Sequence, residues 1–223
     1  LARADLMPAS VAKLQTLLPA ARFVDASPAV NRVMDIKSDL EIQAMRDAAA
    51  LNAKGFAMFL SLLRDGAAET DVKREVLREL TEQGSEEAHA EVVLGDNSAM
   101  PHAGYKASNG HVLRPGTPAF IEFSGSISNC ASGLVRTALL GRNREIEALY
   151  SVAREAVDAI EATLRPGIAS GEVDAAARDV VTIAGRADTY RHRAGYACNA
   201  WILYGATPGS IDITITLTAV AGC

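Results

Sequence analysis

The chain has 223 residues, and its 49% share of hydrophobic residues is enough for a packed core, which argues against a disordered protein. A net charge of -5, with no cluster of Lys or Arg, argues against a nucleic-acid-binding surface. Three widely spaced cysteines that form no C-x-x-C pair are typical of a reducing compartment, so we expect a cytoplasmic protein without structural zinc.

The first part of the chain predicts a small α/β segment followed by a long helix. Apolar residues at helical spacing predict a helix through Val11 and Leu14, and residues 21–26 predict a short strand. Ser38 and Glu41 form a capping box, which predicts that the long helix begins at Ser38. Its buried stripe is expected to comprise Ile42, Met45, Ala49, Ala53, Phe56 and Phe59 or Leu60.

Helical and strand patterns then alternate along the rest of the chain. The predicted helices cover residues 70–83, 144–164 and 170–184, and the predicted strands cover 91–95, 119–123, 133–140 and 211–218. The longest uncharged stretch, residues 194–211, contains three glycines and a proline, so we expect no membrane-spanning segment. Because the first residue is Leu rather than Met, we expect the chain to begin inside a longer protein.

A short motif recurs in the two halves of the chain. Leu-Arg-Asp-Gly at residues 63–66 and Leu-Arg-Pro-Gly at 164–167 each lie between a long predicted helix and a shorter one. The motif alone could mark any helix end, but the shared context favours an internal duplication. Two related halves predict an α+β domain in which helices back a sheet and a cleft lies where the halves meet.

Several short sequence motifs, in the same order along the chain, resemble those of the pita-bread superfamily of creatinase, Xaa-Pro peptidases and methionine aminopeptidase. They lie at residues 33–42, 101–102, 113–116, 121–123, 135–141 and 192–196, so the resemblance covers about residues 33–197. It implies a pita-bread domain over residues 33–223 with an internal pseudo-two-fold repeat, truncated at the C-terminus. It also implies that residues 1–32 are the tail of an N-terminal domain and linker. Members of the superfamily are often dimers, so we expect a homodimer.

The positions that would bind metal in the superfamily are changed in this chain. Its metallopeptidases bind two divalent ions through two Asp, one His and two Glu. The resemblance places Glu122 and Gly133 at the two Asp positions and Tyr196 at the His position, and Asp212 is the single carboxylate side chain after Trp201. Because a divalent ion needs several anionic oxygens, we expect no metal centre and no other cofactor.

Two metal-free branches of the superfamily, creatinase and ectoine hydrolase, cleave C–N bonds at amidine-like carbons. Glu122 and Tyr196 resemble the ectoine hydrolase branch, whereas Val135 replaces a Glu that binds the guanidinium in creatinase. The resemblance therefore implies a metal-independent hydrolase of a small amidine-type compound. It makes His102 and Glu122 the catalytic residues, with Tyr196 and Arg193 binding the substrate, because a His can transfer the protons of such a hydrolysis.

Two other functions remain open from the sequence. One is a conventional Xaa-Pro metallopeptidase, which the missing ligands disfavour, and the other is a catalytically inactive or truncated homologue acting as a binding or dimerisation module. The candidate residues also have structural alternatives. His102 could be a solvated loop residue, and Glu122 could pair with Arg136 or Arg193, since a buried carboxylate needs a partner.

Overall fold

The computed structural model describes residues 8–99, 110–190, 194 and 217–220. These residues form parts of two compact units, Leu1–Asp39 and Leu40–Cys223. In the first unit, α1 (Pro8–Leu17) confirms the predicted helix, and α2 (Ser27–Asp35) follows it. The predicted strand at residues 21–26 is wrong. The Asp25 carboxylate instead accepts a hydrogen bond from the Ser27 amide (2.8 Å), and this Asx-type contact leads the chain into α2.

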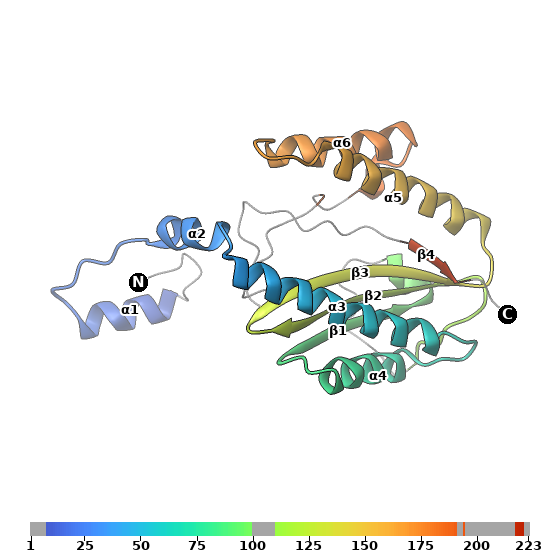
Figure 1. Cartoon of the computed structure of the whole chain (residues 1–223), viewed down its shortest axis with the longest axis horizontal. Helices are drawn as coiled ribbons and strands as arrows, with labels where there is room; N and C mark the ends of the chain where they lie inside the picture. The colour runs from blue at the N-terminus through green and yellow to red at the C-terminus, as the bar shows by residue number, and fades with distance from the viewer. Residues whose placement is uncertain (1–7, 100–109, 191–193, 195–216, 221–223) are drawn as a thin grey trace. The chain divides into compact units, whose positions relative to one another are not determined.

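The second unit contains two helix pairs and a sheet (Figure 1). The elements agree with the predicted helices and strands to within a few residues, except that residues 211–216 of the last predicted strand lie outside the described part. In chain order they are α3 (Asp39–Leu62), α4 (Glu69–Glu82), β1 (Ala88–Leu94), the 3-10 helix η1 (Gly95–Ala99), β2 (Pro118–Ile127), β3 (Cys130–Leu140), α5 (Arg144–Thr163), α6 (Ser170–Ile183), the 3-10 helix η3 (Ala187–Thr189) and β4 (Leu217–Val220).

The four strands lie in the order β1-β2-β3-β4. The first three are antiparallel neighbours, and β4 pairs in parallel with β3. Ser128 and Asn129 make the turn between β2 and β3 with positive φ angles of 52° and 59°. The Glu86 carboxylate accepts the amide hydrogens of both turn residues, at 2.9 and 2.8 Å, and thereby compensates a backbone conformation that is costly outside glycine.

The two faces of the sheet differ in composition because successive side chains of a strand point to opposite sides. One face, here the helix face, packs with α3 and α4 into an apolar core. It consists of Ala90, Val92, Leu94, Ala119, Ile121, Phe123 and Ala138, which cluster with Phe59, Val72, Val76 and Leu80. The opposite face, here the polar face, carries the polar side chains His89, Glu91, Glu122, Ser124 and Thr137 at the alternate positions, together with the apolar Val93, Phe120, Val135 and Leu139.

The buried side of α3 differs from the predicted stripe. Residues Ala44, Ala48, Leu51, Asn52, Gly55 and Phe59 are buried, whereas Ile42 and Ala49 are exposed. The reason lies in the tertiary contacts of α3. A Cβ atom at Gly55 would lie 2.8 Å from Leu80 Cδ2, so a glycine permits this close approach of α3 to α4. Asn52 is buried because its side chain accepts the Gly125 amide hydrogen (2.8 Å) and donates to the Ser132 carbonyl, which ties α3 to β2 and β3.

The recurring motif adopts the same turn in both helix pairs. Gly66 and Gly167 have positive φ angles of 78° and 86°, and Ala68 and Ala169 then precede α4 and α6 in extended conformation. Strands equivalent to β1 and β2 after α6 would lie outside the described residues. The internal repeat and the division of the chain at residue 32 therefore remain predictions.

Candidate functional site

Within the described residues, the candidate functional site lies on the polar face of β1, β2 and β3. Glu122 of β2 is the direct partner of Glu91 on β1 and of Val135 on β3, and His89 is the partner of Ser124. Directly opposite residues on an antiparallel pair share a face, with Cβ atoms about 4.5–5.5 Å apart. Two carboxylates therefore extend from neighbouring positions of the same sheet surface.

Glu91 is a site residue that the sequence analysis did not single out. Its side chain is only 2% exposed, and its Oε1 lies 3.6 Å from His89 Nε2. Its Oε2 accepts no hydrogen bond from the part of the chain that the structure describes. The signal that could have found it is a Glu next to apolar strand residues, but Glu91 is the first residue of the predicted strand 91–95, whereas the observed strand begins at Ala88 and encloses it.

The sequence-predicted site residues are only partly described. Glu122 lies on the polar face and is half-buried, and its catalytic role remains a prediction. Arg136 is the cross-strand partner of Ile121 and so belongs to the helix side of β3, while the suggested Glu122–Arg136 ion pair remains a prediction. His102, Arg193 and Tyr196 lie outside the described residues, and their roles remain predictions.

The described strands do not fit a two-metal centre. Glu122 supplies one carboxylate, whereas Gly133, on the same face beside Val135, supplies no side-chain ligand. Among residues 8–99, 110–190, 194 and 217–220, no three His, Cys, Asp or Glu side chains are grouped so that they could hold a metal ion. We therefore derive no chemical step through a metal.

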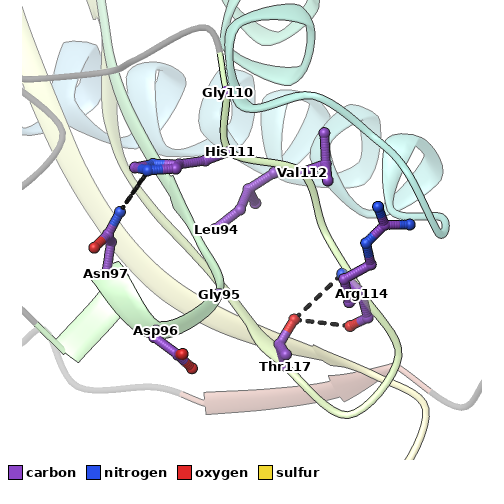
Figure 2. Close-up of a pocket in the computed structure, with 9 residues that line it drawn as sticks. All are labelled: Leu94, Gly95, Asp96, Asn97, Gly110, His111, Val112, Arg114 and Thr117. Carbon is purple, nitrogen blue, oxygen red and sulfur yellow. Dashed lines mark hydrogen bonds between the residues drawn. The ribbon is translucent and has the colours of Figure 1, made fainter.

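A pocket of about 380 Å³ lies at the end of β1 (Figure 2). His111 and Asn97 point toward one another across it, with Asn97 Nδ2 2.8 Å from His111 Nδ1. Behind the imidazole, the buried Glu69 Oε2 lies 3.7 Å from His111 Nδ1 and accepts the Leu94 amide hydrogen at 2.9 Å. The lining residues are Leu94, Gly95, Asp96, Asn97, Gly110, His111, Val112, Arg114 and Thr117, none of which belongs to the polar face.

The second helix pair anchors the region near the predicted substrate-binding residues. Asp174 Oδ1 of α6 accepts the Ala194 amide hydrogen at 2.7 Å, and Asp174 Oδ2 pairs with Arg178 at 2.9 Å. The Arg178 guanidinium lies 4.6 Å from the centre of the Tyr190 ring. Burial raises the pKa of Tyr190 to about 12, and its hydroxyl has no hydrogen-bond partner in the described structure. Asp174 thus fixes the backbone of Ala194. In the sequence, Ala194 directly follows Arg193 and lies two positions before Tyr196.

Comparison with known proteins identifies the family to which the chain belongs. The model of metallopeptidase family M24 matches residues 43–200. The probable dipeptidase PepE of Mycobacterium tuberculosis is 32% identical over 174 residues, which are 77% of this chain and 46% of that protein. The putative dipeptidase YkvY of Bacillus subtilis is 28% identical over 79% of this chain and 48% of that protein. The chain thus spans about half the length of these curated relatives.

Solved structures share the fold. An Xaa-Pro dipeptidase from Bacillus anthracis superimposes with a TM-score of 0.84 at 26% identity, covering 92% of this chain and 57% of that chain. The dipeptidase PepE of Mycobacterium ulcerans superimposes with a TM-score of 0.78 at 26% identity, covering 88% of this chain and 53% of that one. The expected pita-bread architecture is confirmed at this level, while homodimer formation stays a prediction.

The comparisons overturn the expected chemistry. The prediction of an ectoine hydrolase-like enzyme with a small amidine-type substrate is wrong, because the matched relatives are named dipeptidases and an Xaa-Pro dipeptidase. The resemblance was drawn from Glu122 and Tyr196 alone, and two substituted ligand positions do not identify a substrate. None of the described helices is long and apolar enough to span a membrane, while cytoplasmic location remains a prediction.

Proposed function

Because the chain belongs to metallopeptidase family M24, we propose that it is part of a peptidase that hydrolyses the C–N bond of short peptides, with dipeptides as the favoured substrates. The observation that carries the proposal is the 32% identity to the probable dipeptidase PepE across 77% of this chain. The fold shared with an Xaa-Pro dipeptidase at 26% identity supports the same substrate class, including peptides with proline after the cleaved bond.

The polar face supplies the described part of the proposed site. In peptide hydrolysis, water adds to the carbonyl carbon, and the C–N bond breaks as the leaving nitrogen takes up a proton. Glu122 adds negative charge on this face, where it can orient a substrate through the substrate's N–H groups. His102 remains the proposed group that accepts a proton from water and returns it to the nitrogen, with Tyr196 and Arg193 proposed to bind the substrate.

A direct assay tests this function. The purified protein is incubated with Ala-Pro and with Ala-Ala, and release of free amino acids is followed with added Mn²⁺ and, separately, with a chelator. We expect hydrolysis, and a loss on the order of 100-fold in kcat/KM for Glu122→Gln and for His102→Ala. Activity that survives chelation supports the predicted metal independence, whereas activity that requires Mn²⁺ contradicts only that part. No hydrolysis of either peptide under any condition contradicts the proposed function.

A second function is favoured by one specific observation. Gly133 lies on the polar face at a position where the superfamily pattern has a carboxylate, so the strands lack a group used for catalysis there. The alternative is a homologue that binds peptides but does not cleave them. Binding of Ala-Pro without turnover supports this alternative.

Partial restoration of the missing carboxylates tests this explanation. If the glycine at position 133 has weakened metal binding, Gly133→Asp together with Glu122→Asp should bind Mn²⁺ more tightly than the unmodified protein in a calorimetric titration, because two carboxylates then face the same site. The matched control is Gly171→Asp, at an exposed glycine of α6 away from the polar face. Tighter Mn²⁺ binding in the control alone, or in neither variant, contradicts this explanation.

A further inference from the structure

His89 and Glu91 form a side-chain pair on β1 to which the proposed function gives no role. Both belong to the polar face, where His89 is the cross-strand partner of Ser124 and Glu91 that of Glu122. The Glu91 side chain is 2% exposed and the His89 side chain is 38% exposed, and His89 Nε2 lies 3.6 Å from Glu91 Oε1. A buried carboxylate thus lies beside an imidazole that solvent can reach. Enzymes that transfer protons through a histidine often orient it with a buried carboxylate in this way.

The carboxylate determines which nitrogen of His89 can accept a proton. Ionised Glu91 accepts hydrogen bonds, so the neutral tautomer that it favours carries the hydrogen on Nε2 and leaves the lone pair on Nδ1. The 3.6 Å separation exceeds an ordinary hydrogen bond, but contacts of this kind often shorten when a substrate binds. His89 therefore has the form of a proton acceptor, with Nδ1 as the accepting atom.

Glu91 can also compensate the positive charge that His89 gains when it accepts a proton. Its Oε2 has no hydrogen-bond partner in the described structure, and a buried carboxylate is costly unless it is paired. A charge on the neighbouring imidazole lowers this cost, and the low exposure of Glu91 leaves little water to screen the attraction. The pair is therefore suited to hold a proton for part of a reaction.

Hydrolysis of a peptide moves both protons of the attacking water to the leaving nitrogen, which ends as an ammonium ion. We propose that His89, positioned by Glu91, transfers the second of them, an assignment that rests on the proposed function. The first proton passes through His102 as the water oxygen bonds to the carbonyl carbon. Nδ1 of His89 then removes the proton of the hydroxyl group on that carbon. One of the two negative oxygens forms the C=O bond of the carboxylate, the C–N bonding pair leaves with the nitrogen, and protonated His89 gives its proton to the free amine.

The second transfer matters most when the leaving group is a poor one. An amine leaves with difficulty, and removal of the hydroxyl proton places a second negative oxygen on the carbon, which helps to expel the nitrogen. A p-nitrophenolate leaves without a proton, so the hydrolysis of an activated ester does not need this step. Loss of His89 should therefore slow the cleavage of a peptide far more than that of an activated ester.

Steady-state kinetics with two substrates that share an acyl group test the assignment. Ala-Pro and alanine p-nitrophenyl ester are compared in the unmodified protein, in His89→Ala and in Glu87→Gln, an exposed control that precedes β1. We expect His89→Ala to lower kcat/KM for Ala-Pro on the order of 100-fold and to change that for the ester by less than about 3-fold. Added imidazole should restore part of the lost Ala-Pro hydrolysis, and the control should change neither substrate.

A further pair of variants tests the positioning role of Glu91. Glu91→Gln keeps the shape of the side chain and removes its charge, so it should lower kcat for Ala-Pro on the order of 10-fold, leave KM unchanged and spare the ester. Glu91→Asp keeps the charge and should recover part of this loss. A rise in KM with kcat unchanged, or an equal loss on both substrates, contradicts the positioning role.

Two results would overturn the role of His89 alone, namely an equal loss on peptide and ester in His89→Ala, or full activity of that variant on Ala-Pro. If the ester is not a substrate, rescue by imidazole decides the question, and its absence contradicts the assignment. Should His89→Ala fail to fold, as judged by circular dichroism, His89→Gln must show the same selective loss. No hydrolysis of any peptide by the unmodified protein contradicts the proposed function and this assignment together.

Discussion

The two helix pairs use the same turn but pack into apolar clusters of very different size. The pair α3–α4 lies over the helix face of the sheet and shares a large apolar cluster that includes Phe59, Leu80 and Phe123. The pair α5–α6 shares a smaller cluster built largely from small side chains, including Ala156, Ala177 and Ala194. A similar local sequence thus produces a similar turn, while the partner of the helices decides how much apolar surface is buried.

The described structure also contains two buried side-chain polar atoms without a hydrogen-bond partner. One is Glu91 Oε2 on the polar face of the sheet, and the other is the Tyr190 hydroxyl, which follows α6. The two differ in charge. An unpaired buried hydroxyl costs about 1–3 kcal/mol, whereas an ionised buried carboxylate without a partner costs considerably more.

The largest expected effect comes from truncating the core of each helix pair. Phe59→Ala in α3 should lower the free energy of unfolding by about 3–5 kcal/mol, because it removes a fully buried ring. Ile160→Ala in α5 should cost less, about 2 kcal/mol, because the smaller cluster around it can collapse more easily. Urea unfolding followed by circular dichroism measures both. An equal or larger loss for Ile160→Ala would contradict the contrast between the two clusters.

A middle-sized effect is expected at the side chains that tie each helix pair to the rest of the chain. Asn52→Ala should cost about 1–3 kcal/mol, since it leaves the buried Gly125 amide and the Ser132 carbonyl without their side-chain partner. Asp174→Asn keeps an acceptor for the Ala194 amide and loses only a partly exposed ion pair with Arg178, so about 0–1 kcal/mol is expected.

Chemical denaturation of the two variants at the same pH gives the comparison, with Gln43→Ala as an exposed control on α3. That control should lie within about 0.5 kcal/mol of the unmodified protein. A loss at Asp174→Asn as large as that at Asn52→Ala would show that the second tether depends on charge rather than on the hydrogen bond.

The smallest effect at neutral pH is expected for Tyr190→Phe, which removes the unpaired hydroxyl. Its signature lies in the pH dependence. The pKa of Tyr190 is raised from 10.0 to about 12 in the folded protein, mainly by burial. Above pH 10 the unfolded chain therefore loses this proton first, so stability falls as the pH rises from 10 to 12.

Measurements of the urea midpoint at pH 7, 10 and 12 test this expectation. The unmodified protein should lose stability relative to Tyr190→Phe between pH 10 and pH 12, and the two should have similar midpoints at pH 7. Parallel behaviour of the two proteins over the whole range would mean that the Tyr190 hydroxyl titrates as an exposed group.

The sequence predicted elements well and functional chemistry poorly. Helix ends were found because glycine and capping residues act locally, as at Gly66 and Gly167 with their positive φ angles. The buried side of α3 was missed because Asn52 and Gly55 face the interior for reasons of hydrogen bonding and close packing, which hydrophobic periodicity does not contain. The substrate was missed because Glu122 and Tyr196 are single substituted positions, and a substrate is selected by the many contacts of a whole site.

What the sequence by itself determined is the side of the sheet on which each strand residue lies. Glu91 stands between Ala90 and Val92, and Glu122 between Ile121 and Phe123, so the two-residue period of a strand keeps both carboxylates off the helix face that these apolar residues share. Only the tertiary structure decided that they lie opposite one another and that Glu91 is buried. Register and burial depend on contacts between segments far apart in the chain, which the pattern within one strand does not encode.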